Sequence, residues 1–377
     1  MGSLNSIKQI VVSASASRSS GALTIYKQFL NHLPDYIDGM HYTIFVDPFM
    51  PQPVITGVDY ITVNTKRQYQ RILFDWYLSG KELKKRNIIP DLIISLQNTG
   101  LRCLKEYPQL VYFHQPFPFY TYNFKLNNRG ELAALMYKYI YPIFVKKSIS
   151  KDTQFVGQIP FISEGISKLF KVPAEHVHTL FPDVESIETA SVTNYDKWDD
   201  GCNHFMYPAT AYRYKGHLTI VEALLLLKER GVNNIKVHFT LTENEMPLLK
   251  QKVRKYGLER SIDFMGPVPH EIILRMYKSS VGLLFPSVIE TLGLPLLEAS
   301  VFGKPIIAAD VRYAHEVIGN YEGAKFVNPN DFMKWADEIY NITKKNQHYD
   351  CLKTDEKSSW DDFFSIARQL AKIDNNN

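Results

Sequence analysis

The feature that most constrains the fold is an alternation of two kinds of segment, which runs twice along the 377-residue chain. Short apolar or β-branched runs alternate with amphipathic stretches of helical length, first before residue 184 and again after residue 204. This alternation is typical of parallel sheets that are covered by helices on both faces. Two series of similar size therefore predict an α/β chain of two doubly wound domains, whose ligands bind beyond the carboxyl ends of the strands.

A polar stretch over residues 185–203 interrupts the alternation and predicts a structureless linker between the domains. We expect an N-terminal domain over residues 1–184 and a C-terminal domain over residues 204–350. A last helix, at about residues 358–373, is expected to pack back on the N-terminal domain. A chain of this length is too long for one comfortable core, which also favours two domains.

The apolar runs predict the strands, and one helix has a pattern that stands out. Strands are expected at residues 9–13, 42–46, 60–63, 91–95 and 110–113 in the first series, and at residues 204–207, 235–241, 262–264, 281–285 and 305–309 in the second. The clearest helix covers residues 66–86, where large side chains recur at helical spacing: Tyr69, Ile72, Leu73, Trp76 and Tyr77. This spacing predicts that they form one buried stripe.

Composition excludes several classes of protein. With 45% hydrophobic and 22% charged residues the chain has the make-up of an ordinary globular protein. Its 43 basic and 39 acidic residues give a net charge of +4 without a charge block typical of nucleic-acid binding. Its three cysteines lie far apart and match no zinc or disulfide framework. The sequence lacks an apolar run that could span a bilayer and a signal-peptide pattern, so we expect a cytoplasmic location.

The most informative motif is FPSVIETLGLPLLEASVFGKPIIAAD, residues 285–310. A strand ends at Phe285, and Pro295 stands where the first turn of a helix tolerates a missing N–H. The N–H groups at such a helix start form a site for anions. Glu290 and Glu298 flank this turn, and because two carboxylates would repel a phosphate, we expect them to bind hydroxyl groups of a sugar and a ribose. Taken singly, a solvated glutamate and a simple Gly-Leu-Pro turn remain the plainer alternatives.

The joint pattern resembles the signature of retaining glycosyltransferases of family 4, in which two glutamates separated by seven residues bracket a Gly-Leu-Pro turn. The resemblance implies the GT-B fold, two Rossmann-like domains that face each other across a cleft. It also implies that Glu298 binds the ribose hydroxyls, that Glu290 is the catalytic group beside the transferred sugar, and that the backbone of the intervening turn covers sugar and phosphate. This turn consists of Thr291, Leu292, Gly293 and Leu294. The family usually has glycine where this chain has Thr291, whose side chain narrows the expected sugar pocket.

A second motif, PATAYRYKG at residues 208–216, follows a predicted strand and precedes a predicted helix. Arg213 and Lys215 at this strand end are expected to contact the donor diphosphate, with two solvated loop cations as the alternative. We find no pair of acidic residues of metal-ligand type at a strand end. The positive charge for the leaving nucleoside diphosphate is therefore assigned to protein cations, and neither a metal nor a cofactor is expected.

Two motifs in the first series are candidates for contacts with the donor or the acceptor. The loop SASASRSSGA, residues 13–22, places Gly21 at a helix entrance, where N–H groups can face the diphosphate or the acceptor. It lacks the G-x-G-x-x-G fingerprint of nicotinamide enzymes. His114 follows a predicted strand, and the resemblance places a catalytic histidine beside the transferred sugar; a satisfied core histidine is the alternative. The aromatics that follow are expected to stack on the acceptor or to pack under a loop: Phe117, Phe119 and Tyr120.

These motifs predict a metal-independent transferase that takes its sugar from a UDP- or GDP-sugar and gives it to a glycan or lipid-linked acceptor. The resemblance implies retention of configuration and a role in bacterial surface polysaccharide assembly. A nucleotide-sugar epimerase and a non-catalytic sugar-binding protein are the alternatives. Residues 136–147, which include Lys146 and Lys147 among tyrosines, predict either peripheral contact with the inner membrane surface or a core helix with a solvated basic end.

Overall fold

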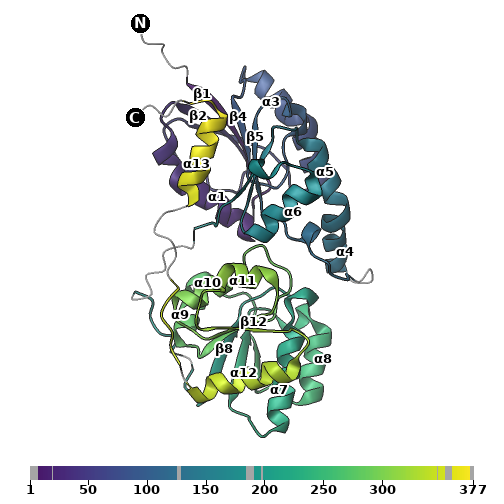
Figure 1. Ribbon diagram of the computed structural model, residues 1–377, viewed down its shortest axis with the longest axis vertical. Helices are drawn as coiled ribbons and strands as arrows, with labels where there is room; N and C mark the ends of the chain where they lie inside the picture. Colours follow the sequence, from purple (N-terminus) through teal and green to yellow (C-terminus); the bar gives the residue numbers. More distant parts are fainter. Residues whose placement is uncertain are drawn as a thin grey trace. The chain divides into compact units, whose positions relative to one another are not determined.

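The computed structural model describes residues 7–18, 20–124, 129–183, 191–196, 198–345, 347–352 and 359–373, and it divides into two compact units (Figure 1). The N-terminal unit contains Met1–Asp183 together with Glu356–Asn377, and the C-terminal unit contains Val184–Asp355. Each unit has its own parallel sheet, so the predicted pair of Rossmann-like domains is confirmed.

The N-terminal sheet has seven strands in the order β3-β2-β1-β4-β5-β6-β7, all parallel. The strands are β1 (Lys8–Ser13), β2 (Met40–Val46), β3 (Val58–Thr62), β4 (Leu92–Ser95), β5 (Gln109–Phe113), β6 (Gln154–Gly157) and β7 (Val177–Thr179). The first five are the predicted ones. Strand β1 pairs with β2 on one side and with β4 on the other, so the direction of winding reverses at β1.

Helices cover both faces of this sheet (Figure 1). They are α1 (Ser20–His32), α2 (Gln68–Leu73), α3 (Ser79–Lys85), α4 (Arg129–Leu135), α5 (Tyr141–Ser148) and α6 (Pro160–Phe170). The last helix, α13 (Ser359–Leu370), lies in the same unit, although 175 residues separate it from Asp183. Its side chains Trp360 and Phe364 are buried, and both rings pack within 6.0 Å of Phe29 on α1.

The predicted helix 66–86 exists, but its predicted buried stripe is wrong. A π-turn, η2 (Phe74–Leu78), joins α2 to α3 and makes them one continuous helix. Phe74 and Leu83 are buried, whereas Tyr69, Leu73 and Tyr77 are 59%, 45% and 57% exposed. The periodicity is real, but the large side chains on it do not lie on the face that the sheet covers.

The C-terminal sheet has six parallel strands in the order β10-β9-β8-β11-β12-β13. The strands are β8 (Asn203–Tyr207), β9 (Ile235–Phe239), β10 (Ile262–Phe264), β11 (Gly282–Phe285), β12 (Ile306–Ala309) and β13 (Ala324–Val327). The helices are α7 (His217–Glu229), α8 (Pro247–Tyr256), α9 (His270–Ser279), α10 (Leu294–Val301), α11 (Arg312–Ile318) and α12 (Phe332–Lys345). Here β8 pairs with both β9 and β11, so this sheet has its reversal of winding at β8.

The predicted linker is only partly described, and the described part is not structureless. Residues 185–190 and 197 lie outside the described residues. The remainder packs on the C-terminal unit: the backbone N–H of Tyr195 donates to Ser279 Oγ at 2.7 Å, and Trp198 stacks on His204 with ring centroids 4.5 Å apart. Polar composition therefore predicted irregular backbone correctly, but not its attachment to the surface.

Within the described residues, no helix combines the length and apolar character needed to cross a bilayer.

Candidate functional site

In the C-terminal unit, two loops leave the sheet where its winding reverses and lie against each other. The first, residues 208–216, follows β8, and the second, residues 286–293, follows β11. The N–H of Val288 donates to the carbonyl oxygen of Tyr214 at 2.9 Å. Gly216 has a φ of 74°, and a Cβ placed there would lie 2.6 Å from the carbonyl oxygen of Pro286. The two loops can approach this closely only because residue 216 is glycine.

This approach brings Lys215 and Glu290 into contact. Lys215 Nζ lies 2.5 Å from Glu290 Oε1, and the two side chains are 15% and 14% exposed. The hydroxyl of Tyr207, at the end of β8, donates to the carbonyl oxygen of Lys215 and so fixes the loop. Burial and the Glu290 charge raise the pKa of Tyr207 well above its usual value, so it stays a hydrogen-bond donor. A charge pair this poorly solvated is costly unless both partners are in place.

The turn before α10 leads into a helix that begins at Leu294 with Pro295 in its first turn, as the sequence predicted. Gly293 has a φ of 73° and accepts the first turn bond from the N–H of Leu296 at 2.8 Å. The hydroxyl of the buried Tyr313 donates to the carbonyl oxygen of Ser287 at 2.7 Å and supports the loop from α11. Helix α10 thus begins at Leu294 beside Glu290, and its dipole places partial positive charge there.

The residues of this turn and of the Lys215 loop differ in how far their side chains are exposed to a ligand. Leu292 is 3% exposed, so its side chain belongs to the core and only its backbone can meet a ligand. Thr291 and Leu294 are partly exposed. Arg213 is exposed, whereas Lys215 in the same short turn is held inside the loop contact.

Glu298 lies one turn into α10 and is held from α9. His270 Nε2 lies 2.8 Å from Glu298 Oε1, and the carboxylate side chain is 13% exposed. Burial, and then the charge of Glu298, raise the pKa of the buried Tyr277 well above its usual value. Sequence analysis missed His270, because its only signal is its place at the start of a helix that packs beside α10.

Another missed residue, His217, lies under the Lys215 loop at the start of α7. It is 1% exposed, and its ring centroid lies 4.7 Å from that of Tyr207. Burial, with a smaller contribution from the charge of Lys215, lowers its pKa to about 3. The ring is therefore neutral and fills space beneath the ion pair without adding positive charge.

In the N-terminal unit, the side chain of Gln97 links the segments at the carboxyl ends of the strands. Its Oε1 accepts from the N–H of Ala16 at 2.9 Å, and its Nε2 donates to Ser13 Oγ at 2.8 Å and Asp75 Oδ1 at 3.1 Å. Arg71 donates to the carbonyl oxygen of Gln97 and to Thr99 Oγ1. The loops after β1 and β4 and the helix at residues 68–85 thus form one buried network.

His114 stands beside this network at the end of β5. Its backbone N–H donates to Asn98 Oδ1 at 2.6 Å, and its Nε2 lies 3.2 Å from the carbonyl oxygen of Leu96. Burial, with a smaller contribution from the nearby Arg71 charge, lowers its pKa to about 4. The ring is neutral at pH 7, and its Nε2 lies near both the carbonyl oxygen of Leu96, which can only accept, and Asn98 Nδ2, which can only donate and is 3.4 Å away. A neutral imidazole has one donor and one acceptor nitrogen, and either can hydrogen-bond a substrate hydroxyl.

The remaining predicted residues of this unit have weaker structural support. Gly21 lies exposed in the first turn of α1, with open space where a Cβ would stand, so its packing does not require glycine. Phe119 packs on Phe113 with ring centroids 5.5 Å apart, and a Cβ on Gly165 would meet its ring at 2.6 Å. Phe117 stacks with Tyr137, and Tyr120 packs on Phe161. These aromatic contacts are those of residues packed under a loop, the alternative that the sequence left open.

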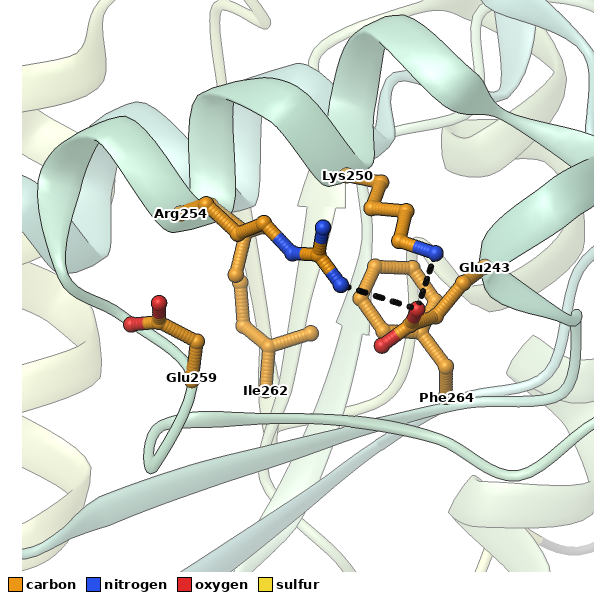
Figure 2. Close-up of a pocket in the computed structure, with 7 residues that line it drawn as sticks. Glu243, Lys250, Arg254, Glu259, Ile262 and Phe264 are labelled. Atoms are coloured by element: carbon orange, nitrogen blue, oxygen red, sulfur yellow. Dashed lines mark ion pairs between the residues drawn. The ribbon is translucent and has the colours of Figure 1, made fainter.

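Two further observations concern a metal site and a hollow elsewhere in the C-terminal unit. Among the described residues, no group of three or more metal-ligand side chains is placed to hold a metal ion. Figure 2 shows a separate hollow under α8, where Glu243 lies 2.6 Å from Lys250 and 3.8 Å from Arg254. The charges there neutralise each other, and the lining contains none of the predicted donor residues.

Comparison with known proteins agrees with this fold. Residues 196–358 match the family "Glycosyl transferases group 1". The chain is 21% identical over 294 residues to the O-antigen chain mannosyltransferase RfbU of Salmonella typhimurium, which covers 76% of each chain. The crystal structure of Anabaena Alr3699/HepE in complex with UDP and glucose superposes with a TM-score of 0.66 at 12% identity, over 97% of this chain and 100% of that one. That of the lipopolysaccharide outer core galactosyltransferase WaaB superposes with a TM-score of 0.59 at 14% identity, over 97% and 94%.

The chain has the GT-B fold, with two Rossmann-like units that each contain a parallel sheet. Residues 196–358 are similar to group 1 glycosyl transferases, and the chain is a glycosyltransferase similar to O-antigen mannosyltransferases.

Proposed function

We propose that this glycosyltransferase moves a sugar from a nucleoside-diphosphate sugar to a glycan or lipid-linked acceptor, with retention of configuration and without a metal ion. The observation that carries the proposal is the pair of loops at the reversal point of the C-terminal sheet. They bring one cation and one carboxylate to 2.5 Å from each other beside a helix start, with a second carboxylate one turn further along that helix. This arrangement suits a ligand that has a diphosphate between two groups of hydroxyls.

Each group has a definite task in this proposal. The Lys215 ammonium and the N-terminus of α10 stabilise the diphosphate as the bond between the sugar C1 and the phosphate oxygen breaks and the electron pair stays on that oxygen. Glu298, held by His270, accepts hydrogen bonds from the ribose hydroxyls. Glu290 accepts from hydroxyls of the transferred sugar, and it orients Lys215 until the donor binds. Arg213 adds charge at the rim of the same loop.

The acceptor is assigned to the N-terminal unit. There the neutral His114 offers a ring nitrogen to a hydroxyl, and the loop that ends at Gly21 meets the start of α1. An uncharged ring suits a sugar hydroxyl better than a phosphate. Phe117 and Tyr120 are only partly buried by their packing, and we assign their remaining exposed ring surface to the glycan.

The biological setting follows from the relatives. The Salmonella protein is named an O-antigen chain mannosyltransferase, and WaaB a lipopolysaccharide outer core galactosyltransferase. We place this chain in the same kind of process, the assembly of a bacterial surface polysaccharide from a UDP- or GDP-sugar. Acceptors in such a process are held on lipid, so the enzyme works in the cytoplasm at the inner membrane surface.

The proposal is tested by incubating the protein with UDP- and GDP-sugars, with and without lipid-linked glycans from a bacterial membrane extract, and analysing the products. Sugar transfer that needs the extract supports it. A changed nucleotide sugar in the absence of extract indicates an epimerase. A donor that stays intact under all conditions, although it raises the thermal stability of the protein, indicates a binding protein without activity.

A further inference from the structure

Two buried tyrosines of the C-terminal unit lie beneath the pair of loops that brings Lys215 to Glu290. Tyr207 is the last residue of β8, Tyr313 belongs to α11, and both side chains are 0% exposed. A phenylalanine would fill such a core position without bringing a polar atom into it, whereas a buried hydroxyl costs free energy unless it is hydrogen-bonded. The presence of tyrosine at both positions therefore points to the bonds that the two hydroxyls make.

The rings of these tyrosines are held by close packing. The ring centroid of Tyr207 lies 5.8 Å from that of Phe285, the last residue of β11, which is 1% exposed. A Cβ placed on Gly293 would lie 3.3 Å from the ring of Tyr313 and 3.4 Å from that of Phe285. Phe285 thus packs on one tyrosine and shares the space beneath Gly293 with the other, so both hydroxyls are fixed in place.

Each hydroxyl is donated to a backbone carbonyl oxygen of a different loop. Tyr313 donates to the carbonyl oxygen of Ser287 at 2.7 Å, in the same loop as Glu290. Tyr207 donates to the carbonyl oxygen of Lys215 itself. The two tyrosines therefore hold one loop each, close to the side chains that form the ion pair.

The bond from Tyr313 is the first in a series of hydrogen bonds that crosses from one loop to the other. The peptide group between Ser287 and Val288 accepts from the Tyr313 hydroxyl through its carbonyl oxygen. Through its N–H, the same peptide group donates to the carbonyl oxygen of Tyr214 at 2.9 Å. That carbonyl belongs to the peptide group between Tyr214 and Lys215, so the series reaches the backbone of the lysine.

The series continues through the N–H of Lys215. This N–H donates to the carbonyl oxygen of Tyr212 at 3.0 Å, so the peptide group before Lys215 both accepts and donates. Hydrogen bonds in series polarise the groups between them, and each bond strengthens its neighbours. The bond from Tyr313 therefore strengthens the contact between the two loops, although Tyr313 belongs to a different helix.

We infer that Tyr313 and Tyr207 are positioning residues for sugar transfer, which place the Glu290 carboxylate and the Lys215 ammonium through the backbone of the two loops. The inference rests on the proposed function for what that ion pair does. Without its hydroxyl, Tyr313 no longer begins the series of hydrogen bonds, and the loop that carries Glu290 loosens. Without its hydroxyl, Tyr207 releases the carbonyl of Lys215. The first change should therefore act mainly on turnover, and the second mainly on donor binding.

The first measurement reads the ion pair directly in Tyr313→Phe and Tyr207→Phe, which each remove one hydroxyl and keep the ring. The folded whole protein is treated with a limiting amount of acetic anhydride, and acetylation of Lys215 is measured by peptide mass spectrometry relative to the exposed Lys344. In the parent, Lys215 should react slowly, because its side chain is 15% exposed and paired with Glu290. Each variant should raise its rate about fivefold, the effect of one lost buried hydrogen bond.

The second measurement separates turnover from binding, with transfer assays and with calorimetric titration of UDP and GDP. Tyr313→Phe should lower kcat about fivefold and change nucleotide affinity less than about twofold. Tyr207→Phe should weaken nucleotide affinity about fivefold. A merely structural role would lower the melting temperature of both variants and leave kcat, nucleotide affinity and Lys215 acetylation as in the parent.

The matched control is Tyr321→Phe in the same unit. Tyr321 is 4% exposed, and its hydroxyl donates to the carbonyl oxygen of Lys304 at 2.8 Å, just before β12 begins. The control removes the same kind of buried bond at the opposite edge of the sheet. It should lower the melting temperature about as much as the other two variants do, and leave Lys215 acetylation, kcat and nucleotide affinity unchanged.

Equal changes in all three variants would overturn the inference in favour of general destabilisation. Lys215 acetylation in Tyr313→Phe and Tyr207→Phe at the rate of the parent would overturn it as well. A parent that transfers no sugar, with Lys215 acetylation raised in these two variants and not in Tyr321→Phe, would support the placement of the ion pair by the tyrosines and reject the proposed function alone.

Discussion

The two units place different chemistry at equivalent edges of their sheets. In the C-terminal unit the loops at the reversal point hold charges, with Lys215 against Glu290 and His270 against Glu298. In the N-terminal unit the side chain that faces the edge is a neutral histidine, and the charges of Arg71 and Asp75 are buried behind it in a hydrogen-bonded network. One fold thus gives a charged edge and a neutral edge.

The difference shows what each edge can recognise. Glu290 and Lys215 orient each other, so a ligand that carries both phosphate and hydroxyls can take each of them as a partner. His114 cannot gain a proton near pH 7, so it meets a ligand as an uncharged ring. On this account the donor binds where charges are paired in advance, and the acceptor hydroxyl meets an uncharged group.

The largest effect is expected from Glu290→Gln. The amide keeps a hydrogen-bond acceptor for Lys215 and nearly the same shape, but it removes the charge beside the transferred sugar. We expect kcat to fall about a hundredfold, comparable to the loss of one electrostatic group beside a reacting centre, while donor affinity changes little. Separate measurements of turnover and of donor affinity check this. Unchanged turnover would remove Glu290 from the catalytic role.

A smaller effect is expected from His270→Ala. Loss of the 2.8 Å contact frees the Glu298 carboxylate to rotate, and a hydrogen bond to a charged group is worth roughly 1.5 to 3 kcal/mol, so nucleotide affinity should fall about tenfold. His270→Asn, which keeps a donor on a shorter side chain, should restore part of it. In a double-mutant cycle the loss should vanish when Glu298 is already alanine. Additive losses would show that His270 acts independently of Glu298.

The neutral edge predicts a specific pH dependence of stability. The folded-state pKa of His114, about 4, lies below the usual value near 6.5, so the unfolded chain gains the proton first as pH falls. The stability that neutral His114 contributes is therefore present above pH 6.5 and is lost progressively down to about pH 4. Urea unfolding of the parent and of His114→Gln over this range checks it. The variant should lose less stability than the parent; equal losses would show that His114 titrates normally.

The smallest effect is expected from chelation. Because Lys215 and the start of α10 are assigned to stabilise the leaving diphosphate, transfer activity should be the same with and without EDTA. Loss of activity that magnesium or manganese restores would replace this assignment with a metal ion.

The charged edge could be predicted from sequence because most of it lies in one contiguous segment. Glu290, Gly293 and Glu298 belong to a single strand, loop and helix, so their spacing in the chain already fixes their spacing in the structure. The contact between Lys215 and Glu290 spans 75 residues. The sequence predicted both side chains for the same ligand, but not that they would pair with each other.

The neutral edge was less predictable because it is assembled from distant segments. Gln97 joins backbone and side chains from residues 13–16 and 75, and no local pattern marks a glutamine for that role. Strands β6, β7 and β13 were not predicted either. Pairing with a neighbouring strand that is distant in the chain is what fixes β6 and β7, and β13 is fixed by its pairing with β12.

The wrong prediction for residues 66–86 has a different cause. Tyrosine and leucine at helical spacing indicate an apolar stripe, but the pattern cannot tell which surface covers it. In this helix Phe74 and Leu83 are buried against the sheet, whereas Tyr69, Leu73 and Tyr77 are exposed to solvent. The excess of apolar side chains belongs to a surface of the protein and not to its core.

Calorimetric titration of UDP and GDP into the whole protein and three variants tests the central claim most directly. Lys215→Ala and Glu298→Ala each remove a charged hydrogen-bond partner, so each should weaken binding of the preferred nucleotide about tenfold to a hundredfold. Lys252→Ala is the matched control, because it breaks a partly buried ion pair with Glu222 elsewhere in the same unit, and it should bind like the parent. If Lys215→Ala and Glu298→Ala bind both nucleotides as tightly as the parent, the loops that follow β8 and β11 are not the donor site.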